Sequence, residues 1–138
     1  MSITAGLCTT YKAEVLAGVH TTADTYMIAL YPSSATLNVG TTTYSSTGEV
    51  PNGSGYATGG KALTSLTVVT DSTTAILDFA DASWAGATFS AAGALIYNAS
   101  KGNKAVAVLS FGGTITSAAG TFYVTFPAPA AATGLIRI

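Results

Sequence analysis

The sequence predicts an all-β, mainly antiparallel single domain: a β-sandwich or jelly-roll-like barrel with one short N-terminal helix. Thr, Val, Ile, Tyr and Phe, which favour pleated and half-buried surfaces, recur in short runs along the chain. Clusters of Gly, Asn, Asp and Ser separate these runs at short intervals, as in proteins built from strands and tight turns. The chain has 138 residues, a length that usually forms one core. We therefore expect one β-sandwich domain over residues 1–138, with short N- and C-terminal contact segments.

The expected helix lies near the N-terminus. Tyr11, Val15 and Val19 recur at intervals of four residues, and Leu16 widens the apolar stripe that they form. Either of the two threonines before Tyr11 can cap the N-terminus through its hydroxyl group. Gly18 suits the C-terminal stop, because glycine adopts the left-handed conformation in which many helices end. These signals predict one helix of about nine residues.

After the helix the apolar pattern changes to a period of two, which is typical of strands. Residues 25–31 (TYMIALY) predict a strand that Pro32 ends. Residues 61–70 and 74–80 flank an Asp-Ser pair and predict a hairpin. Residues 33–60 are mostly Thr, Ser, Gly and Asn. They predict a long polar loop, and loops of such length are usually functional or ordered by a partner.

The second half of the chain predicts further strands. Residues 93–98 and 104–111 are expected to pair, and the second is apolar on both faces, which places it at the centre of a sheet. Gly112 and Gly113 mark a bulge or bend. A corner closed by a tryptophan, an alternating strand and a last short strand are expected at residues 81–84, 121–126 and 134–138.

The chain carries few charges for a soluble domain. Five Lys or Arg and six Asp or Glu residues make up 8% of the sequence, against about 25% in an ordinary soluble domain. Apolar runs such as 105–109 and 126–132 are far shorter than the roughly 20 residues that a membrane-spanning helix needs. The positive residues are scattered, whereas nucleic-acid binders gather them in a stripe. We expect neither a membrane nor a nucleic-acid partner. The first positive residue is Lys12, so no secretory signal peptide is expected.

No group of residues has the spacing of a catalytic, cofactor-binding or metal-binding site. Residues 53–60 are rich in glycine, but they lack the third glycine of a dinucleotide fingerprint, and a strand pattern follows them. His20, the single histidine, follows the predicted helix, where a polar group suits the helix dipole. Asp78 and Asp81 fit solvated turn and strand-face carboxylates better than a hydrolase pair or a calcium site. Cys8 fits a small buried hydrophobe. We expect a protein that is not an enzyme and has no cofactor.

The order and spacing of several segments carry a resemblance that extends over nearly the whole chain. The segments are Gly18-Val19-His20, residues 25–37, residues 48–60, residues 79–84, residues 93–98 and the closing Gly134-Leu135-Ile136-Arg137-Ile138. With these segments the chain resembles a family of small virion structural proteins of tailed bacteriophages, some of which look like capsid decoration (cement) proteins. The resemblance implies a non-enzymatic, β-rich protein that forms homotrimers on the capsid exterior and binds the major capsid protein. It carries over no catalytic residue.

The expected contact surfaces are the N-terminal segment, the polar loop and the C-terminal strand. The assembly-contact candidates are Ile3, Leu7, Tyr44, Glu49, Tyr56, Leu135, Ile136 and Arg137. Among them, Tyr44 and Tyr56 are the best candidates for exposed aromatic contacts, because they lie in the polar loop. Low charge fits such a role, since a neutral surface can be covered without the desolvation of many ions.

A second hypothesis keeps the β-rich fold and changes the role. The long Ser, Thr and Gly loop with its tyrosines also fits a tail- or fibre-associated structural protein, or a module that binds a glycan or host surface. A hydrolase built on His20 and Asp78 ranks last, because base, acid and nucleophile must be positioned together.

Overall fold

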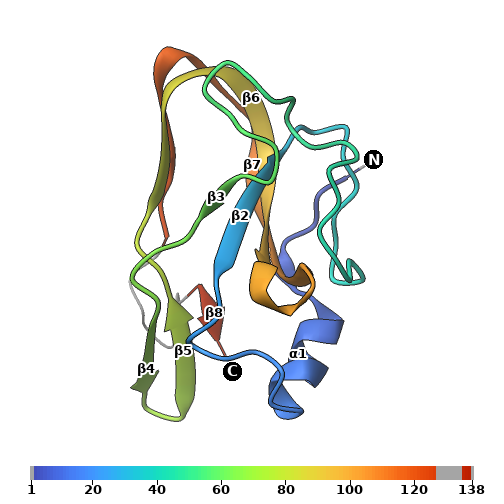
Figure 1. Cartoon of the computed structure of the whole chain (residues 1–138), viewed down its shortest axis with the longest axis vertical. Helices are drawn as coiled ribbons and strands as arrows, with labels where there is room; N and C mark the ends of the chain where they lie inside the picture. The colour runs from blue at the N-terminus through green and yellow to red at the C-terminus, as the bar shows by residue number, and fades with distance from the viewer. Residues whose placement is uncertain (1, 127–134, 138) are drawn as a thin grey trace.

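The computed structural model describes residues 2–126 and 135–137, and that part of the chain is mainly antiparallel strand with one short helix (Figure 1). Within it lie eight strands, one α-helix and one 3₁₀ turn. They are β1 (Gly6–Leu7), α1 (Thr9–Leu16), β2 (Tyr26–Tyr31), β3 (Lys61–Ala62), β4 (Thr67–Asp71), β5 (Thr74–Asp78), β6 (Ala82–Asn98), η1 (Ala99–Lys101), β7 (Lys104–Val124) and β8 (Ile136–Arg137). The all-β prediction is confirmed, as two sheets whose described strands do not close into a barrel.

Two sheets divide the strands. The larger sheet has the order β1-β7-β6-β2-β3, and the smaller has the order β4-β5-β8. Within each sheet, neighbouring strands pair antiparallel, as the alternating pattern predicts. The hairpin expected around the Asp-Ser pair is confirmed, since Asp71 pairs with Thr74 and Ser72 takes a φ of 57° at the turn. The last expected strand is confirmed at Ile136 and Arg137, whereas Gly134 and Ile138 lie outside the described residues.

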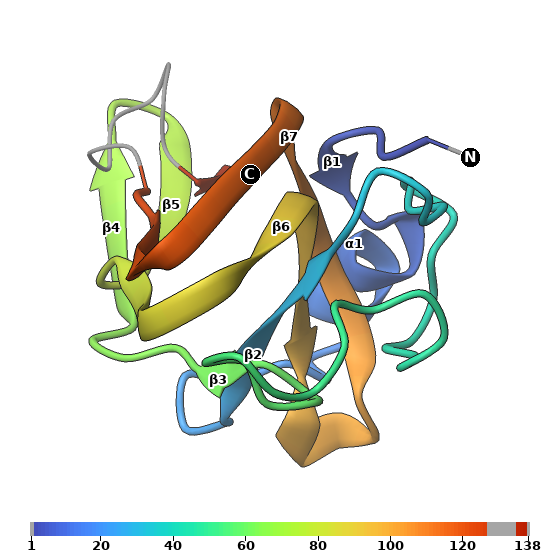
Figure 2. The same ribbon diagram turned by 90° about the horizontal axis from the view of Figure 1, so that it is seen from above.

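The β6–β7 hairpin is a long bent ribbon. Its strands have 17 and 21 residues, much longer than the segments expected from the sequence. Ala91 pairs with Ile115 and Gly93 with Ser110, so residues 111–114 stand opposite a single residue of β6. The extra residues form the bulge predicted at the glycine pair. There the ribbon arches over the top of the molecule and descends on the other side (Figures 1 and 2).

The predicted corner at residues 81–84 is wrong. Ala82 and Trp84 belong to β6, where they pair with Val124 and Phe122 of β7. The aromatic content that suggested a corner instead fills the inside of the arch. The rings of Trp84 and Phe122 lie 6.2 Å apart, and those of Phe89 and Phe122 lie 5.0 Å apart. These rings lie on one limb of the ribbon and contact Tyr56 of the loop and Phe111 at the bend, and this apolar contact supports the bent shape.

The N-terminal helix has about the expected length, but it begins differently. Cys8 occupies the N-cap position without a side-chain hydrogen bond, so the predicted threonine cap is wrong. The helix ends at Leu16, and Gly18 with a φ of 76° provides the expected stop. Tyr11 is buried, whereas the Leu16 side chain is 90% exposed, so Leu16 does not belong to the packed stripe. Eight residues give about two turns, and only the face with Tyr11 meets the sheets.

Candidate functional site

The N- and C-terminal contact candidates lie side by side in the folded chain. Leu7 and Arg137 both line two shallow hollows, although 130 positions separate them in the sequence. One hollow, of about 420 Å³, also has Lys12, Val15 and Leu16 in its wall. The other, of about 290 Å³, has Leu109 and Leu135. We call these seven residues the terminal face.

The terminal face is apolar at its centre and cationic at its rim. Leu16 is 90% exposed, the largest exposure among the large hydrophobic side chains of the described residues. Lys12 and Arg137 are exposed beside it. An exposed apolar patch bordered by polar groups is typical of a surface that contacts another protein.

Two other terminal candidates serve the interior. Ile136 is 1% exposed and belongs to the core. Ile3 is half-buried, bridges to Leu37, and its side chain packs beside Gly93 of β6. These two residues therefore position the terminal segments, and their neighbours Leu7, Leu135 and Arg137 line the surface.

The three loop candidates form one buried hydrogen-bond network. The Tyr44 hydroxyl donates to Glu49 Oε1 at 2.6 Å, and the Tyr56 hydroxyl donates to Glu49 Oε2. Gly59 N–H also donates to Oε2, at 2.8 Å. The Tyr56 hydroxyl in turn accepts from Leu30 N–H of β2 at 2.9 Å. Tyr56 is 3% exposed, so the expectation that it offers an exposed contact is wrong: it fastens the loop to the sheet.

Further tyrosines hold the same loop. The ring of Tyr44 stacks on that of Tyr97 with centroids 4.4 Å apart, and the Tyr97 hydroxyl donates to the Gly59 carbonyl at 2.6 Å. The Tyr31 hydroxyl donates to the Ser45 carbonyl at 2.6 Å. Burial, with the nearby Glu49 carboxylate, raises the pKa values of Tyr31, Tyr44 and Tyr56 above the ordinary range, so these phenols stay neutral donors.

His20 has a structural role. Its Nε2 lies 2.9 Å from Glu14 Oε1, and its Nδ1 lies 2.9 Å from Asn98 Nδ2. Asn98 Oδ1 accepts from Ser100 N–H and Asn98 Nδ2 donates to Asp24, which fixes the orientation of the amide. His20 Nδ1 is therefore an acceptor, and Nε2–H donates to Glu14. Both ring nitrogens are engaged, which leaves neither to activate a nucleophile.

The two aspartates considered for hydrolysis have separate structural surroundings. Asp81 Oδ1 accepts from Phe126 N–H at 2.8 Å and fixes the end of the β6–β7 ribbon. Asp78 closes β5, and its Oδ1 is buried with no hydrogen-bond partner among the described residues. Cys8 is fully buried, as expected for a small hydrophobe. Among residues 2–126 and 135–137, no group of three or more His, Cys, Asp or Glu side chains is arranged to hold a metal ion.

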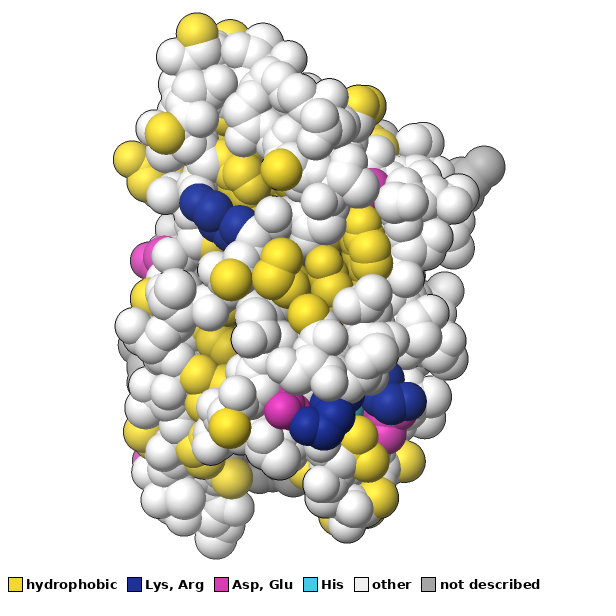
Figure 3. All heavy atoms as spheres, viewed as in Figure 1, with side chains coloured by type: hydrophobic (Ala, Val, Ile, Leu, Met, Phe, Trp, Pro, Cys, Tyr) yellow, Lys and Arg dark blue, Asp and Glu magenta, His cyan; other side chains and the backbone are white. Residues whose placement is uncertain are grey.

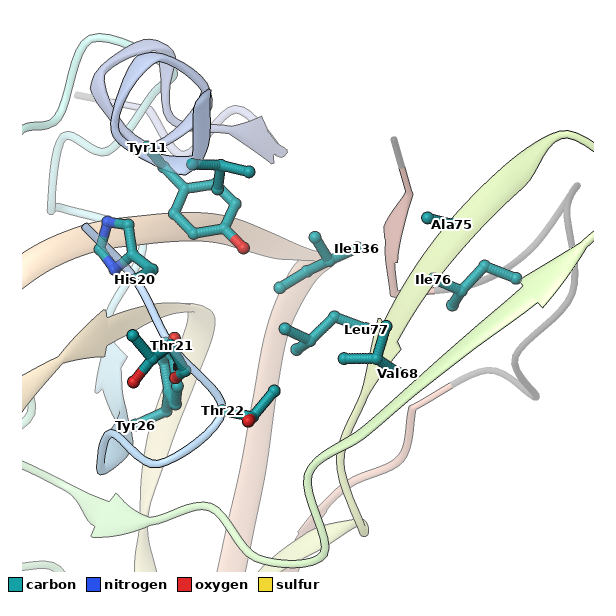
Figure 4. Close-up of a pocket in the computed structure, with 11 residues that line it drawn as sticks. Tyr11, His20, Thr21, Thr22, Tyr26, Val68, Ala75, Ile76, Leu77 and Ile136 are labelled. Carbon is teal, nitrogen blue, oxygen red and sulfur yellow. Dashed lines mark hydrogen bonds between the residues drawn. The ribbon is translucent and has the colours of Figure 1, made fainter. Parts of the chain in front are cut away.

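A cleft that the sequence did not predict separates α1 from the smaller sheet (Figure 4). Its volume is about 240 Å³. One wall comes from α1 and the segment that follows it, and the other from β4, β5 and β8. The lining residues are Tyr11, Val15, His20, Thr21, Thr22, Tyr26, Val68, Ala75, Ile76, Leu77 and Ile136. No local sequence signal marks such a cleft, because its two walls are more than 40 positions apart in the chain.

Comparison of the chain with protein-family models, with curated proteins and with solved structures finds no match. In the part of the chain that the structure describes, no helix is both long and apolar enough to span a bilayer.

Proposed function

We propose that this protein is a non-enzymatic structural protein of a tailed-bacteriophage virion: a capsid decoration protein that binds major capsid subunits on the capsid exterior as a homotrimer. The observation that carries the proposal is the terminal face. It gathers Leu7, Leu135 and Arg137, which the sequence analysis selected as contacts, around the exposed Leu16. A contiguous apolar patch with a polar rim is typical of a surface that another protein covers.

The low charge supports the same proposal. Residues 105–136 contain no charged side chain, a stretch that includes nearly all of β7. Glu14, Asp24, Lys101 and Lys104 neutralise one another in ion pairs. The face in Figure 3 accordingly shows mostly neutral atoms with few charged side chains. A partner can cover such a surface without removing water from many ions.

The mechanism of stabilisation is mass action. A protein that binds the assembled shell, and not the free or unfolded subunits, stabilises the shell in proportion to its occupancy. In a homotrimer each shallow contact occurs three times. The later contacts are intramolecular, so the affinity of the whole exceeds that of one protomer. The contact that the terminal face of any one protomer makes therefore does not need to be strong.

The buried loop network disfavours the glycan-binding alternative. Tyr56 and Glu49 are enclosed, and the Tyr44 ring is stacked on Tyr97. A glycan platform needs the face of an aromatic ring open to the sugar. The Tyr56 ring is enclosed, and one face of the Tyr44 ring is already covered by Tyr97.

The number of copies in purified virions tests the proposal. We expect quantitative mass spectrometry to find the protein in a fixed ratio to the major capsid protein, with many copies per particle. Purified protein added to shells that lack it should bind and raise their disruption temperature, and it should sediment as a trimer. A handful of copies per particle, located at one vertex, would contradict the capsid role and place the protein in the tail.

A further inference from the structure

The cleft beside α1 is large enough for an aromatic side chain. Its volume is about 240 Å³, and an engineered apolar cavity of about 150 Å³ already binds benzene. Val68, Leu77 and Ile136 form an aliphatic wall from the smaller sheet, opposite Tyr11 and Val15 of α1 (Figure 4). The space between them therefore fits a flat apolar group held between aliphatic side chains.

The Tyr11 hydroxyl lies in the cleft without a hydrogen-bond partner among the described residues. Tyr11 is 2% exposed, and its hydroxyl points into the space between the two walls (Figure 4). No hydrogen bond recorded for the described residues involves that hydroxyl. In contrast, Tyr26, Tyr31, Tyr56 and Tyr97 are equally buried, and each of their hydroxyl groups makes a hydrogen bond. The hydroxyl is not fully enclosed, so water in the cleft can bond to it, and an occupant that displaces this water must replace that bond with a polar atom of its own.

The chemistry of the lining residues excludes a charged occupant. No Asp, Glu, Lys or Arg lines the cleft. His20 is its one ionisable nitrogen base, and both of its ring nitrogens are engaged with Glu14 and Asn98. An occupant with a formal charge would lose its hydration without gaining a counter-charge. The fitting occupant is neutral, apolar in its bulk, and carries one atom that can bond to the Tyr11 hydroxyl.

The cleft adjoins the terminal face. Val15 lines both the cleft and the larger hollow of that face. Ile136 lines the cleft, and its neighbours Leu135 and Arg137 line the hollows. A polypeptide that lies on the terminal face can therefore reach the cleft with one side chain.

We propose that the cleft is a pocket for one neutral aromatic side chain that bears a hydrogen-bonding atom, the phenol of tyrosine or the indole of tryptophan, presented by a protein partner. That this partner is a shell subunit rests on the proposed function. The ring specificity, meaning the preference of the cleft for an aromatic ring with a hydrogen-bonding atom, does not. Large aromatic anchors in enclosed pockets carry much of the affinity of protein interfaces.

Methyl-labelled protein titrated with single amino-acid derivatives tests the ring specificity. The probes are the N-acetyl amides of tyrosine, tryptophan and phenylalanine, and their binding is followed by the NMR shifts of the Val68, Leu77 and Ile136 methyl groups. We expect the tyrosine and tryptophan amides to bind about fivefold more tightly than the phenylalanine amide. Tyr11→Phe should remove that preference and leave binding of the phenylalanine amide unchanged. Methyl shifts that are absent with all three probes, or a preference that survives Tyr11→Phe, would overturn the proposal.

Variants in which a large side chain fills the cleft provide a second test of the proposal. Ala75→Trp places a large ring at an exposed position of the cleft wall and should abolish binding of all three amides. Thr22→Trp fills the cleft from the opposite wall and serves if the first variant does not fold. Ala118→Trp, at an exposed site on β7 away from the cleft, should bind like the wild type. Binding that persists in both filled variants would show that the rings bind elsewhere.

Binding of the same variants to shells that lack the protein separates this proposal from the proposed function. Loss of shell binding in Ala75→Trp, with normal binding of Ala118→Trp, supports a shell subunit as the source of the ring. If wild type and Ala75→Trp bind shells equally well, the partner part of this inference fails and the decoration role stands. If the amides bind and the shells do not, the decoration role fails and the ring specificity of the cleft stands.

Discussion

The Tyr44 hydroxyl donates a hydrogen bond of 2.6 Å to Glu49 Oε1. Both residues belong to the long loop of residues 32–60, which connects β2 to β3. The other carboxylate oxygen accepts from Tyr56 and from Gly59 N–H. One buried carboxylate thus joins three points of the loop. The Tyr56 hydroxyl extends the connection to β2 through Leu30 N–H. The long loop is ordered by an internal charge-assisted network.

Replacement of the carboxylate by an amide should weaken this network. Glu49→Gln presents an N–H₂ group to donors, so at least one hydrogen bond is lost and one polar group stays unsatisfied. We expect the free energy of unfolding to fall by about 2 kcal/mol. Tyr44→Phe removes one donor and leaves the other two, and should cost about 1 kcal/mol. Urea unfolding followed by circular dichroism measures both, and a Glu49→Gln variant as stable as the wild type would contradict the role of the network.

The end of the loop depends on a glycine. Gly60 has a φ of 79°, and a Cβ there would lie 2.8 Å from Ala29 Cα and closer still to the Ile28 carbonyl oxygen. Gly60→Ala should therefore cost more than about 3 kcal/mol or prevent folding, because backbone of β2 would have to move. Gly18→Ala is the matched control: its φ is 76°, yet nothing lies within 4 Å, so a loss of about 1 kcal/mol is expected. Thermal unfolding compares the two, and equal losses would show that conformation alone, without the close approach, sets the cost.

The alternation of apolar and polar residues predicted those strands in which buried and exposed side chains alternate. Residues 121–126 alternate as expected, with Phe122 and Val124 buried and Tyr123 68% exposed. The pairing of residues 93–98 with 104–111 is confirmed through Leu95 and Val108. In such strands every second side chain meets the core, so periodicity in the sequence carries the information.

Long-range relationships were not predictable from those patterns. Leu16 has the spacing of a packed residue, but the helix ends there and no element covers it. The network around Glu49 depends on which turn of the loop approaches β2, and a polar loop has no periodicity that encodes this. Leu7 and Arg137 meet because β1 and β8 join different sheets that lie near each other. Proximity of that kind follows from the whole fold and not from any one segment.

Asp24 should make the stability depend on pH in the acid range. Hydrogen bonds from Lys101 at 2.7 Å, from Asn98 and from Thr21 N–H hold the pKa of its carboxyl well below the usual range. In the unfolded chain the pKa is about 3.9. The folded state therefore favours the charged form, and this stabilisation is complete above about pH 5 and is lost as the pH falls toward the folded pKa.

The Asp24→Asn variant has no charge at this position and isolates the contribution of the Asp24 carboxylate to the free energy of unfolding. We expect the wild type to lose stability relative to Asp24→Asn as the pH is lowered from about 5 to about 2. Urea titrations at several pH values give the difference between the two curves, in which the other carboxylates cancel to a first approximation. A difference that stays constant with pH would contradict the assignment.

Cys8 should be chemically inert in the folded protein. Its side chain is fully buried, and burial, with a smaller effect of the Glu14 charge, raises the pKa of the thiol to about 11. Since the thiolate is the reactive form, a thiol reagent at pH 8 should react with the native protein only as fast as the chain opens. In urea the reaction should be immediate. A fast reaction in native buffer would show that the segment around β1 opens locally.

The terminal face offers the most direct mutational test of the assembly role. Leu16 is 90% exposed, so Leu16→Ser removes few internal contacts and should change the free energy of unfolding by less than about 0.5 kcal/mol. If a shell subunit buries that side chain, its loss should weaken binding to shells at least about tenfold, the equivalent of roughly 1.5 kcal/mol of apolar burial. Ile115→Ser is the matched control, since Ile115 is 49% exposed on the arched part of β7 and lies outside the terminal face. Co-sedimentation with shells that lack the protein measures both variants. Loss of binding in Leu16→Ser alone identifies the terminal face as the contact surface, whereas loss in Ile115→Ser alone moves the contact to the arch of the β6–β7 ribbon.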